Sequence, residues 1–537
     1  MKVLLLGGTG VFGSRLARLL VRDGHSVTLA GRTLDTAQDL AQTLGCKAMR
    51  LDRNGDLSGL SGHDVLVDAA GPFHAYGNDG EDPYRLARKA LAAGMHYLDL
   101  ADNAGFCAGI TALDDDARAA GLCAISGLSS VPALSSAAVR ALTGQEVPDV
   151  IETAILPGNR SPRGLSVMAS ILSQAGQPMR LWRGGMWTEA RSWSEPSDYS
   201  LPEGLTRQGW LIEVPDITLF PAHFGAGSVV FRAGLELSVM SYGLRAFAKL
   251  RQWRPIPVTP FVLKSFKLAA DMLEPFGSGR GGMSVMVAVG SERRFWRLLA
   301  EEGDGPFIPA IPARALLRRE TLPVGARPAL EVITLEEAEA AMEDLRVKTV
   351  RSVEPFQPIF PGVLGAAFHD LPEAIRETHR TIDQSRWRGT ATITRGSSLW
   401  SRMLCLAFRF PPAGENMPVE VVKTVTPRGE TWERRFGQSR FVSHLAPTAQ
   451  GMTERFGPFT FLLGLTVDQG TLKYPIRSAR FGPVALPRRL LPQSEAYEYV
   501  QDGRFHFDVR LLAPITGQVM VHYQGNLGPA VSDGQKR

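Results

Sequence analysis

The sequence has little that would place the protein in a secreted, membrane-spanning or nucleic-acid-binding class. Its 537 residues include only four cysteines, which lie far apart without a CxxC pair, so neither a disulfide framework nor a metal site is expected. The formal net charge is only +5 and is spread along the chain, which indicates no nucleic-acid partner. The first apolar run, residues 3–6, is shorter than the apolar stretch of a secretory signal, and no run reaches the roughly 18–20 residues of a membrane-spanning helix. We therefore expect a cytoplasmic protein.

Motifs of several enzyme classes are also missing. Short-chain reductases use a YxxxK pair, whereas Tyr84 is followed at that spacing by Arg88. The sequence also contains no GxSxG elbow, no HExxH and no GxxxxGK[ST] loop. Serine hydrolases, zinc peptidases and P-loop enzymes therefore lack their signatures here.

The composition of the chain changes along its length and predicts several domains, at roughly 150 residues per domain. The first part alternates short apolar runs with helical stretches, the middle mixes longer elements, and the end is rich in strands. A run of prolines between the last two parts is expected to exclude a regular helix. The predicted segments are an NAD(P)-binding domain (1–130), an α+β substrate and dimerisation domain (131–350), a proline-rich linker (351–372), a β-rich domain (373–528) and a disordered tail (529–537).

The alternation in the first part is typical of βαβ units. Its short runs carry apolar residues on both faces, as strands buried in a parallel sheet do. The predicted fold class is thus α/β, a Rossmann doubly wound parallel sheet, followed by an α+β central domain and a β-rich C-terminal domain.

A glycine-rich loop, GGTGVFG, directly follows the first predicted strand and opens a helix. Glycines there permit a tight turn and a close approach of the backbone to a pyrophosphate, whose charge is favoured at the helix N-terminus. A glycine turn without a cofactor is the alternative. The residues predicted to hold the pyrophosphate are Gly7, Thr9, Gly10, Val11, Phe12 and Gly13.

The residue at the end of the second strand indicates the type of cofactor, because an acidic residue there would hold the ribose of NAD(H). Arg32 stands there instead, followed by Thr33, and a guanidinium suits the 2′-phosphate of NADP(H). NADP(H) is therefore favoured over NAD(H), unless Arg32 is an ordinary exposed residue. Asp52, after the third strand, is expected either to contact the adenosine or to cap the strand.

The loop after the fourth strand, AAGPFHAYG, is expected near the nicotinamide. Ala70 and Gly71 would allow the nicotinamide ribose to approach. His74 and Tyr76 in this loop, and His96 at the next strand, are candidate proton donors. Each could instead be an ordinary hydrogen-bonded structural residue.

Five segments together look like the saccharopine dehydrogenase-like family of NAD(P)-dependent reductases, which includes trans-acting enoyl reductases: GGTGVFG, AGR, AAGPFHAYG, GMHYLDLAD and ISGLSSVP. The resemblance covers about the first 135 residues well and the middle part more loosely. It implies a Rossmann domain followed by an α+β substrate and dimer domain. The chain departs from the family's YxDxxGE pattern, because the Gly-Glu pair is missing in the stretch Tyr97–Asn103.

The strand-rich end resembles a domain of unknown function that often follows such proteins, through RFGPFTF, LPRRLLP and GRFHFDV. Its aromatic strands are expected to form a packed core, and a ligand pocket is the alternative. The residues in question are Phe456, Phe459, Phe461, Phe505 and Phe507.

These patterns lead to the hypothesis of an NADP(H)-dependent oxidoreductase with a small, hydrophobic carbonyl or enoyl substrate. The alternative is a non-catalytic NADP(H)-binding scaffold or sensor whose β-rich domain binds a lipid or a protein partner. The sequence leaves open whether the protein forms a homodimer. It also leaves open a peripheral membrane contact through Arg245–Lys267, where basic and aromatic residues are mixed, with a solvated helix pair as the alternative.

Overall fold

The computed structural model describes residues 1–57, 60–77, 80–162, 164–254, 256–408 and 410–530. The chain forms two units, each compact in itself. One comprises Met1–Trp182 and Trp187–Glu354, and the other Arg183–Met186 and the chain from Pro355 onwards. Of the predicted tail, only Pro529 and Ala530 lie within the described residues: Pro529 ends a strand and the Ala530 N–H donates to the Arg386 carbonyl.

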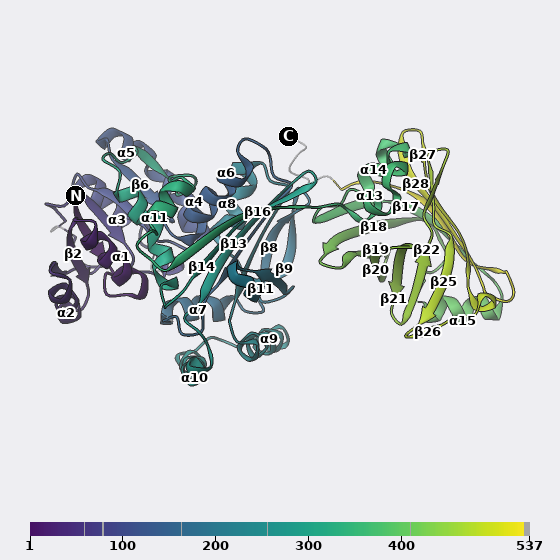
Figure 1. Cartoon of the computed structure of the whole chain (residues 1–537), viewed down its shortest axis with the longest axis horizontal. Helices are drawn as coiled ribbons and strands as arrows, with labels where there is room; N and C mark the ends of the chain where they lie inside the picture. The colour runs from purple at the N-terminus through teal and green to yellow at the C-terminus, as the bar shows by residue number, and fades with distance from the viewer. Residues whose placement is uncertain (58–59, 78–79, 163, 255, 409, 531–537) are drawn as a thin grey trace. The chain divides into compact units, whose positions relative to one another are not determined.

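The first unit begins with a parallel sheet of seven strands in the order β15-β6-β5-β4-β1-β2-β3 (Figure 1). The order reverses between β1 and β4, which is the switch point where doubly wound sheets bind nucleotides. The predicted Rossmann sheet is confirmed. Its strands are β1 (Lys2–Leu6), β2 (Ser26–Gly31), β3 (Lys47–Arg50), β4 (Val65–Asp68), β5 (His96–Asp99), β6 (Cys123–Ser126) and β15 (Gly325–Pro328).

Helices cover both faces of this sheet. Val3 and Leu5 of β1 belong to one hydrophobic cluster and Leu4 and Leu6 to another, so alternate residues of the same strand are buried on opposite sides. The first cluster includes α1 (Val11–Arg22) and α2 (Leu34–Leu44). The second includes α3 (Arg85–Ala92), α4 (Ala104–Gly109) and α5 (Asp114–Ala120). Short 3-10 turns η1 (Phe73–Ala75) and η2 (Ile110–Leu113) connect these elements.

A second, mixed sheet follows in the same unit, with the path β10-β11-β12-β7-β13-β14-β16 and the hairpin β8-β9 attached to β12. Strand β12 runs parallel to β7, whereas β13 runs antiparallel to both β7 and β14. Its strands are β7 (Val150–Leu156), β8 (Pro178–Arg183), β9 (Met186–Arg191), β10 (Ser197–Ser200), β11 (Thr206–Leu211), β12 (Ser228–Gly234), β13 (Gly281–Val289), β14 (Glu292–Ala300) and β16 (Val347–Pro355).

The predicted α+β central part is therefore present, and one hydrophobic cluster joins it to the Rossmann sheet: Leu16 of α1 and Trp296 of β14 belong to the same cluster. The predicted boundary at residue 130 stays a prediction. The helical elements here are η3 (Ser130–Leu134), α6 (Ser135–Thr143), α7 (Leu165–Gln174), η4 (Pro202–Gly204), α8 (Pro215–Phe224), α9 (Ser238–Trp253), α10 (Pro260–Met272), η5 (Glu274–Phe276), η6 (Gly305–Ala310), α11 (Ile311–Leu317) and α12 (Leu335–Ala340).

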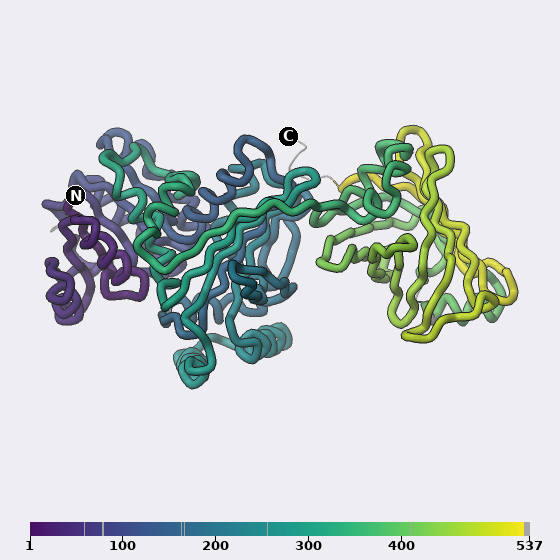
Figure 2. Tube along the Cα trace, viewed as in Figure 1, coloured from purple at the N-terminus to yellow at the C-terminus, as the bar shows by residue number. Residues whose placement is uncertain are grey.

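The second unit is built on an antiparallel sheet of thirteen strands, as expected for the β-rich end. Figure 2 traces successive strands running back and forth beside one another. They are β17 (Gln384–Arg395), β18 (Gly414–Thr426), β19 (Gly429–Phe436), β20 (Ser439–Thr448), β21 (Gly451–Phe456), β22 (Phe459–Leu463), β23 (Thr466–Asp468), β24 (Thr471–Lys473), β25 (Ile476–Phe481), β26 (Val484–Ala485), β27 (Gln493–Gln501), β28 (Arg504–Leu512) and β29 (Val519–Pro529).

Helices in the second unit are short. The segment predicted to exclude a helix contains α13 (Ile359–Leu364), in which Pro361 lies in the first turn. Proline is tolerated there because the first N–H groups of a helix need no partner within it, so this expectation is corrected. The others are η7 (Gly365–Asp370), α14 (Glu373–Thr378), α15 (Leu399–Ala407) and η8 (Arg488–Leu490). No helix in the described part of the chain is long and apolar enough to cross a membrane.

Candidate cofactor site

The glycine-rich loop lies between β1 and α1, at the switch point of the sheet. Gly7 has a φ of 73°, and a Cβ there would lie 2.6 Å from the Cα of Ala70. A Cβ on Gly13 would lie 2.2 Å from the Gly7 carbonyl oxygen. Gly10 donates its N–H to that same oxygen at 2.9 Å. The loop is therefore a tight turn that only glycine permits at Gly7 and Gly13.

The start of α1 presents unused hydrogen-bond donors. Gly10 is the N-cap and provides no side chain to satisfy the first-turn N–H groups, which belong to Val11, Phe12 and Gly13. Thr9 is exposed beside them. Such N–H groups and the helix dipole favour an anion at this position. The predicted pyrophosphate residues thus lie together.

Arg32 and Thr33 lie next to this loop. The Gly7 N–H donates to the carbonyl of Ala30 at 2.9 Å, which ties the loop to the end of β2. Arg32 is exposed and makes no hydrogen bond or ion pair within the residues that the structure describes. Thr33 is the N-cap of α2, yet its hydroxyl does not cap the helix. Both side chains are available to an outside ligand.

Asp52 lies at the same edge of the sheet. The Leu51 N–H donates to the Gly31 carbonyl at 3.0 Å, so the chain that leaves β3 runs beside the end of β2. The Asp52 side chain is exposed and accepts the Asn54 N–H at 3.1 Å. The structure therefore brings Asp52 near Arg32, and the Asp52 carboxylate also closes a local turn.

The loop after β4 places Ala70 against Gly7 of the glycine loop, with Gly71 next in the chain, but it turns Tyr76 inwards. The Tyr76 hydroxyl donates to Asp68 Oδ2 at 2.7 Å, and the Arg53 guanidinium lies 3.8 Å from the centre of the Tyr76 ring. Burial and the charge of Asp68 raise the pKa of the Tyr76 hydroxyl far above its usual value. A phenol held in this way is a poor proton donor to a ligand.

His74 and His96 have different environments. His74 is exposed in η1, and Asp102, just after β5, lies within electrostatic reach of it. His96 begins β5 and is paired in register with Val65, at the amino ends of the strands. Its Nδ1 accepts the Cys123 N–H at 3.0 Å, and burial lowers the pKa of the ring. The structure thus separates His96 from the glycine loop by the length of the strands.

Two buried carboxyl groups, Asp68 and Asp99, lie at the ends of β4 and β5, and of these only Asp99 was noted from the sequence, within the stretch Tyr97–Asn103. Asp68 and Asp99 end neighbouring strands and are directly in register. Asp99 Oδ1 accepts the N–H groups of Ala101 and Gly127 and the Ser126 hydroxyl, at 2.8–2.9 Å. Burial raises the pKa of Asp99 to about 7. An aspartate at the end of each of two consecutive apolar runs is a signal that could have identified this pair.

The central part of the first unit reaches the glycine loop. A Cβ on Gly164, the N-cap of α7, would lie 3.6 Å from Cγ2 of Val11. The segment before α7 therefore packs against the start of α1. Residues of the α+β part are consequently adjacent to the predicted pyrophosphate site.

Comparison with known proteins gives matches at both ends of the chain. Residues 3–125 match the family model described as Saccharopine dehydrogenase NADP binding domain, and residues 371–527 match a domain of unknown function, DUF4166. No curated protein matches the sequence.

Several solved structures are similar in part. Apo saccharopine dehydrogenase (L-Glu forming) from Saccharomyces cerevisiae has a TM-score of 0.43 at 15% identity, covering 65% of this chain and 99% of that one. BdcA from E. coli has a TM-score of 0.19 at 24% identity, covering 23% of this chain and 82% of its own. A putative myo-inositol dehydrogenase from Sinorhizobium meliloti has a TM-score of 0.26 at 11% identity, covering 44% and 70%.

The family matches confirm the resemblance seen in the motifs. The N-terminal match supports an oxidoreductase with a nicotinamide cofactor, in agreement with the strand order and the glycine loop. The chain therefore carries an NADP-binding domain of the saccharopine dehydrogenase type at its N-terminus and a DUF4166 domain at its C-terminus.

Proposed function

We propose that the protein is an NADP(H)-dependent oxidoreductase acting on a hydrophobic carbonyl or enoyl compound. The observation that carries the proposal is the placement of Arg32. This unpaired guanidinium follows the strand to which the glycine loop is hydrogen-bonded. An arginine with free donors at this position suits a 2′-phosphate and cannot accept a hydrogen bond from a ribose hydroxyl.

In this proposal each predicted cofactor residue has one role. The N–H groups at the start of α1 bind the pyrophosphate, and Arg32 and Thr33 bind the 2′-phosphate. Asp52 contacts the adenosine. Ala70, which lies against Gly7, and the adjacent Gly71 leave room for the nicotinamide ribose because neither has a large side chain.

When bound, NADPH supplies the hydride. Reduction of a carbonyl also requires a proton on the oxygen, and we assign its delivery to His74. His74 is the candidate with an exposed ring, and the Asp102 side chain lies within electrostatic reach of it. We place the substrate between the loop after β4 and the α+β part that contacts Val11.

The test uses NADPH deuterated at C4 with a panel of medium-chain aldehydes, ketones and enoyl thioesters, and mass spectrometry of the products. Deuterium on the reacting carbon supports hydride transfer. His74→Gln is expected to lower the rate by about 10²–10⁴-fold while leaving the NADPH Kd unchanged. His63→Gln is the matched control, because His63 precedes β4 at the opposite edge of the sheet. NADPH binding without transfer to any compound would favour the non-catalytic alternative.

A further inference from the structure

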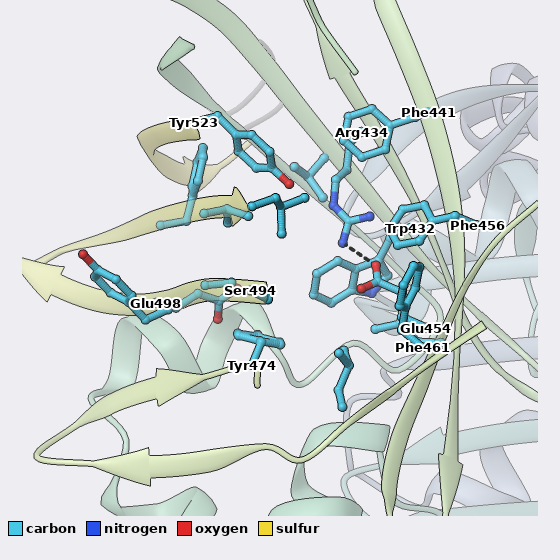
Figure 3. Close-up of a pocket in the computed structure, with 18 of the residues that line it drawn as sticks. Trp432, Arg434, Phe441, Glu454, Phe456, Phe461, Tyr474, Ser494, Glu498 and Tyr523 are labelled. Atoms are coloured by element: carbon cyan, nitrogen blue, oxygen red, sulfur yellow. Dashed lines mark hydrogen bonds and ion pairs between the residues drawn. The ribbon is translucent and has the colours of Figure 1, made fainter. Parts of the chain in front are cut away.

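The thirteen-stranded sheet of the second unit surrounds a cavity of about 170 Å³ (Figure 3). Most of its lining is aromatic or aliphatic and comes from strands far apart in the sequence. The phenylalanines of β19, β20, β21, β22 and β28 are Phe436, Phe441, Phe456, Phe461, Phe505 and Phe507. Phe456, Phe461, Phe505 and Phe507, expected as core, are therefore core residues that also border an open space. Apolar lining of this kind favours the hydrocarbon part of a ligand.

One wall of the cavity carries charged side chains that compensate one another. Arg434 pairs with Glu454 at 3.1 Å and lies over the Trp432 ring, 4.7 Å from its centre. Lys423 is 1% exposed, donates to the Thr378 carbonyl at 2.7 Å and lies 4.0 Å from the same ring centre. Glu498, also on this wall, accepts a hydrogen bond from a buried histidine, His379, at 2.5 Å.

The charged side chains that line the cavity are two cations and two carboxylates, which balance one another: Arg434, Lys423, Glu454 and Glu498. Glu430 is buried beside Lys423, and burial raises the pKa of its carboxyl. His379 adds no charge at neutral pH, since burial and the charge of Lys423 lower its pKa to about 4. A charged ligand would therefore bring an uncompensated charge into an apolar cavity, which is strongly unfavourable. The wall favours a ligand without net charge.

Tyr523 supplies the polar group that is free to bind. Its side chain lines the cavity, and Figure 3 shows the hydroxyl pointing towards Arg434. This hydroxyl has no hydrogen-bond partner within the described residues. Burial raises the pKa of Tyr523 to about 12, so the group is a neutral donor. Tyr523 is half-buried and its hydroxyl opens on the cavity, so a ligand that carries an oxygen can accept its hydrogen bond there.

We propose that this cavity binds an uncharged amphipathic molecule, with a hydrocarbon body among the phenylalanines and a carbonyl or ether oxygen that accepts the Tyr523 hydroxyl. The site lies wholly within the DUF4166 domain. It does not depend on the function proposed for the NADP-binding domain.

The test is calorimetric titration of the full chain, without nucleotide, using 2-decanone as the probe and decanoate as the charged comparison. Wild-type protein is expected to bind 2-decanone at least about tenfold more tightly than decanoate. Tyr523→Phe removes only the hydroxyl and is expected to weaken 2-decanone binding about fivefold. Tyr499→Phe is the control, because Tyr499 lies on β27 but does not line the cavity.

Three results would overturn the proposal: no binding of 2-decanone, tighter binding of decanoate, or equal affinity in Tyr523→Phe and wild type. If Tyr523→Phe binds 2-decanone as tightly as wild type does, the compound binds at another site, such as a substrate site in the first unit. The thermal transition of the second unit in Tyr523→Phe, expected to equal that of wild type, shows whether this unit of the variant is folded. The NADPH affinity of wild type tests the cofactor proposal separately.

A second inference concerns the helix pair α9 and α10 of the first unit, which lies at the rim of the mixed sheet in Figure 1. Large apolar side chains are exposed on both helices. Trp253 at the end of α9 is 88% exposed and Phe261 at the start of α10 is 79% exposed. Others are Leu250, Leu268 and Met272. Exposed apolar surface of this extent indicates a contact surface.

Cations accompany these apolar side chains. Lys249, Arg254 and Lys264 are exposed, and none makes an ion pair within the part of the chain that the structure describes. Arg251, in contrast, is used internally and donates to the carbonyls of the α7 C-terminus. Free cations beside exposed aromatic residues match the chemistry of an anionic lipid surface.

We propose that the adjoining ends of α9 and α10 rest on an anionic membrane, with Trp253 and Phe261 inserted between headgroups. The chain is expected to co-sediment with vesicles of phosphatidylcholine and phosphatidylglycerol in equal parts, and not with phosphatidylcholine alone. The double variant Trp253→Ser, Phe261→Ser is expected to weaken binding about tenfold or more. Leu399→Ser, which changes a 79% exposed residue of α15, should bind as wild type does.

The membrane proposal fails if the double variant binds as wild type, or if both vesicle types bind equally. It also fails if neither vesicle type binds and the double variant instead dissociates a dimer of wild-type chains. In that case the surface would contact a second copy of the chain.

Discussion

At the scale of single residues, two glycines of the loop after β1 have different structural roles. Gly7 takes a left-handed conformation against Ala70, whereas Gly13 allows α1 to pack against Gly7. The spacing of these glycines was recognisable in the sequence because the backbone conformation at Gly7 and the close packing at Gly13 both exclude other residue types. The neighbouring Asp68–Tyr76 contact could not be foreseen, because it depends on how the loop after β4 turns.

Gly13→Ala tests the packing role. The new Cβ would lie 2.2 Å from the Gly7 carbonyl oxygen, so α1 or the loop must move. Overpacking of this kind costs about 1–3 kcal/mol, and the displaced N–H groups should weaken NADPH binding at least about tenfold. Calorimetric titration and thermal melting measure both effects. Gly243→Ala is the control, since a Cβ there meets nothing within 4 Å. Unchanged NADPH affinity in Gly13→Ala would contradict the placement of the pyrophosphate.

Asp216 gives a pH-dependent prediction. It is 1% exposed, and burial, only partly offset by the Ser135 side chain, raises its pKa to about 8. An unfolded aspartate titrates near 3.9, so between these pH values the folded state holds a proton that the unfolded state releases. The free energy of unfolding should therefore fall as pH rises, by about 1.4 kcal/mol per pH unit from this group.

Asp216→Asn removes that titration. We expect the Tm of the variant, relative to wild type, to rise steadily from pH 5 to about pH 7 and to level off above pH 8. Melting curves across this range provide the test. A difference in Tm that does not change with pH would show that Asp216 is ionised in the folded protein.

At the scale of elements, the alternation of strands and helices in the Rossmann sheet was predicted, because buried parallel strands are continuous apolar runs between helices. Strand β15 was not predicted. It is only four residues long, ends in Pro328 and follows β6 by about two hundred residues. Tertiary pairing over long distances leaves no such local pattern.

The end of α1 is fixed to α11 by a buried ionic contact. Arg314 is 1% exposed and pairs with Asp23 at 2.7 Å and Asp344 at 2.6 Å. Burial alone would raise the pKa of Asp23, but hydrogen bonds from Arg314 and Arg318 outweigh it and lower the pKa to about 2. The stabilisation is therefore complete above about pH 4 and is lost as pH falls towards 2.

Asp23→Asn tests this contact. The variant should be less stable than wild type by about 2 kcal/mol at pH 7, and the difference should disappear between about pH 4 and pH 2. Thermal melting at a series of pH values measures it. Asp39→Asn, an exposed change on α2, serves as the control. If the variant is still less stable than wild type at pH 2, the substitution acts sterically and not through the lost ionic contact.

At the scale of the whole molecule, the chain contains two units with separate hydrophobic clusters. The sequence predicted an α/β beginning and a strand-rich end from their different periodicities. The sequence also predicted a domain boundary at residue 130, which stays a prediction, since patterning identifies elements but does not show which of them pack together. One hydrophobic cluster includes residues from both sides of that boundary.

This division predicts two transitions in scanning calorimetry. NADPH at about one hundred times its Kd should stabilise the first unit by about 2.7 kcal/mol and leave the second transition unchanged. 2-Decanone should stabilise the second unit and leave the transition of the first unit unchanged. A single transition that both ligands shift would contradict independent unfolding of the two units.

The central claim is that Arg32 selects NADP(H), and the most direct test is to measure the Kd of NADPH and of NADH for wild type and for Arg32→Ala. Loss of charge-assisted hydrogen bonds should weaken NADPH binding about tenfold or more and leave NADH binding nearly unchanged. Wild-type protein that binds NADH as tightly as NADPH, or a variant that loses affinity for both equally, would contradict the account.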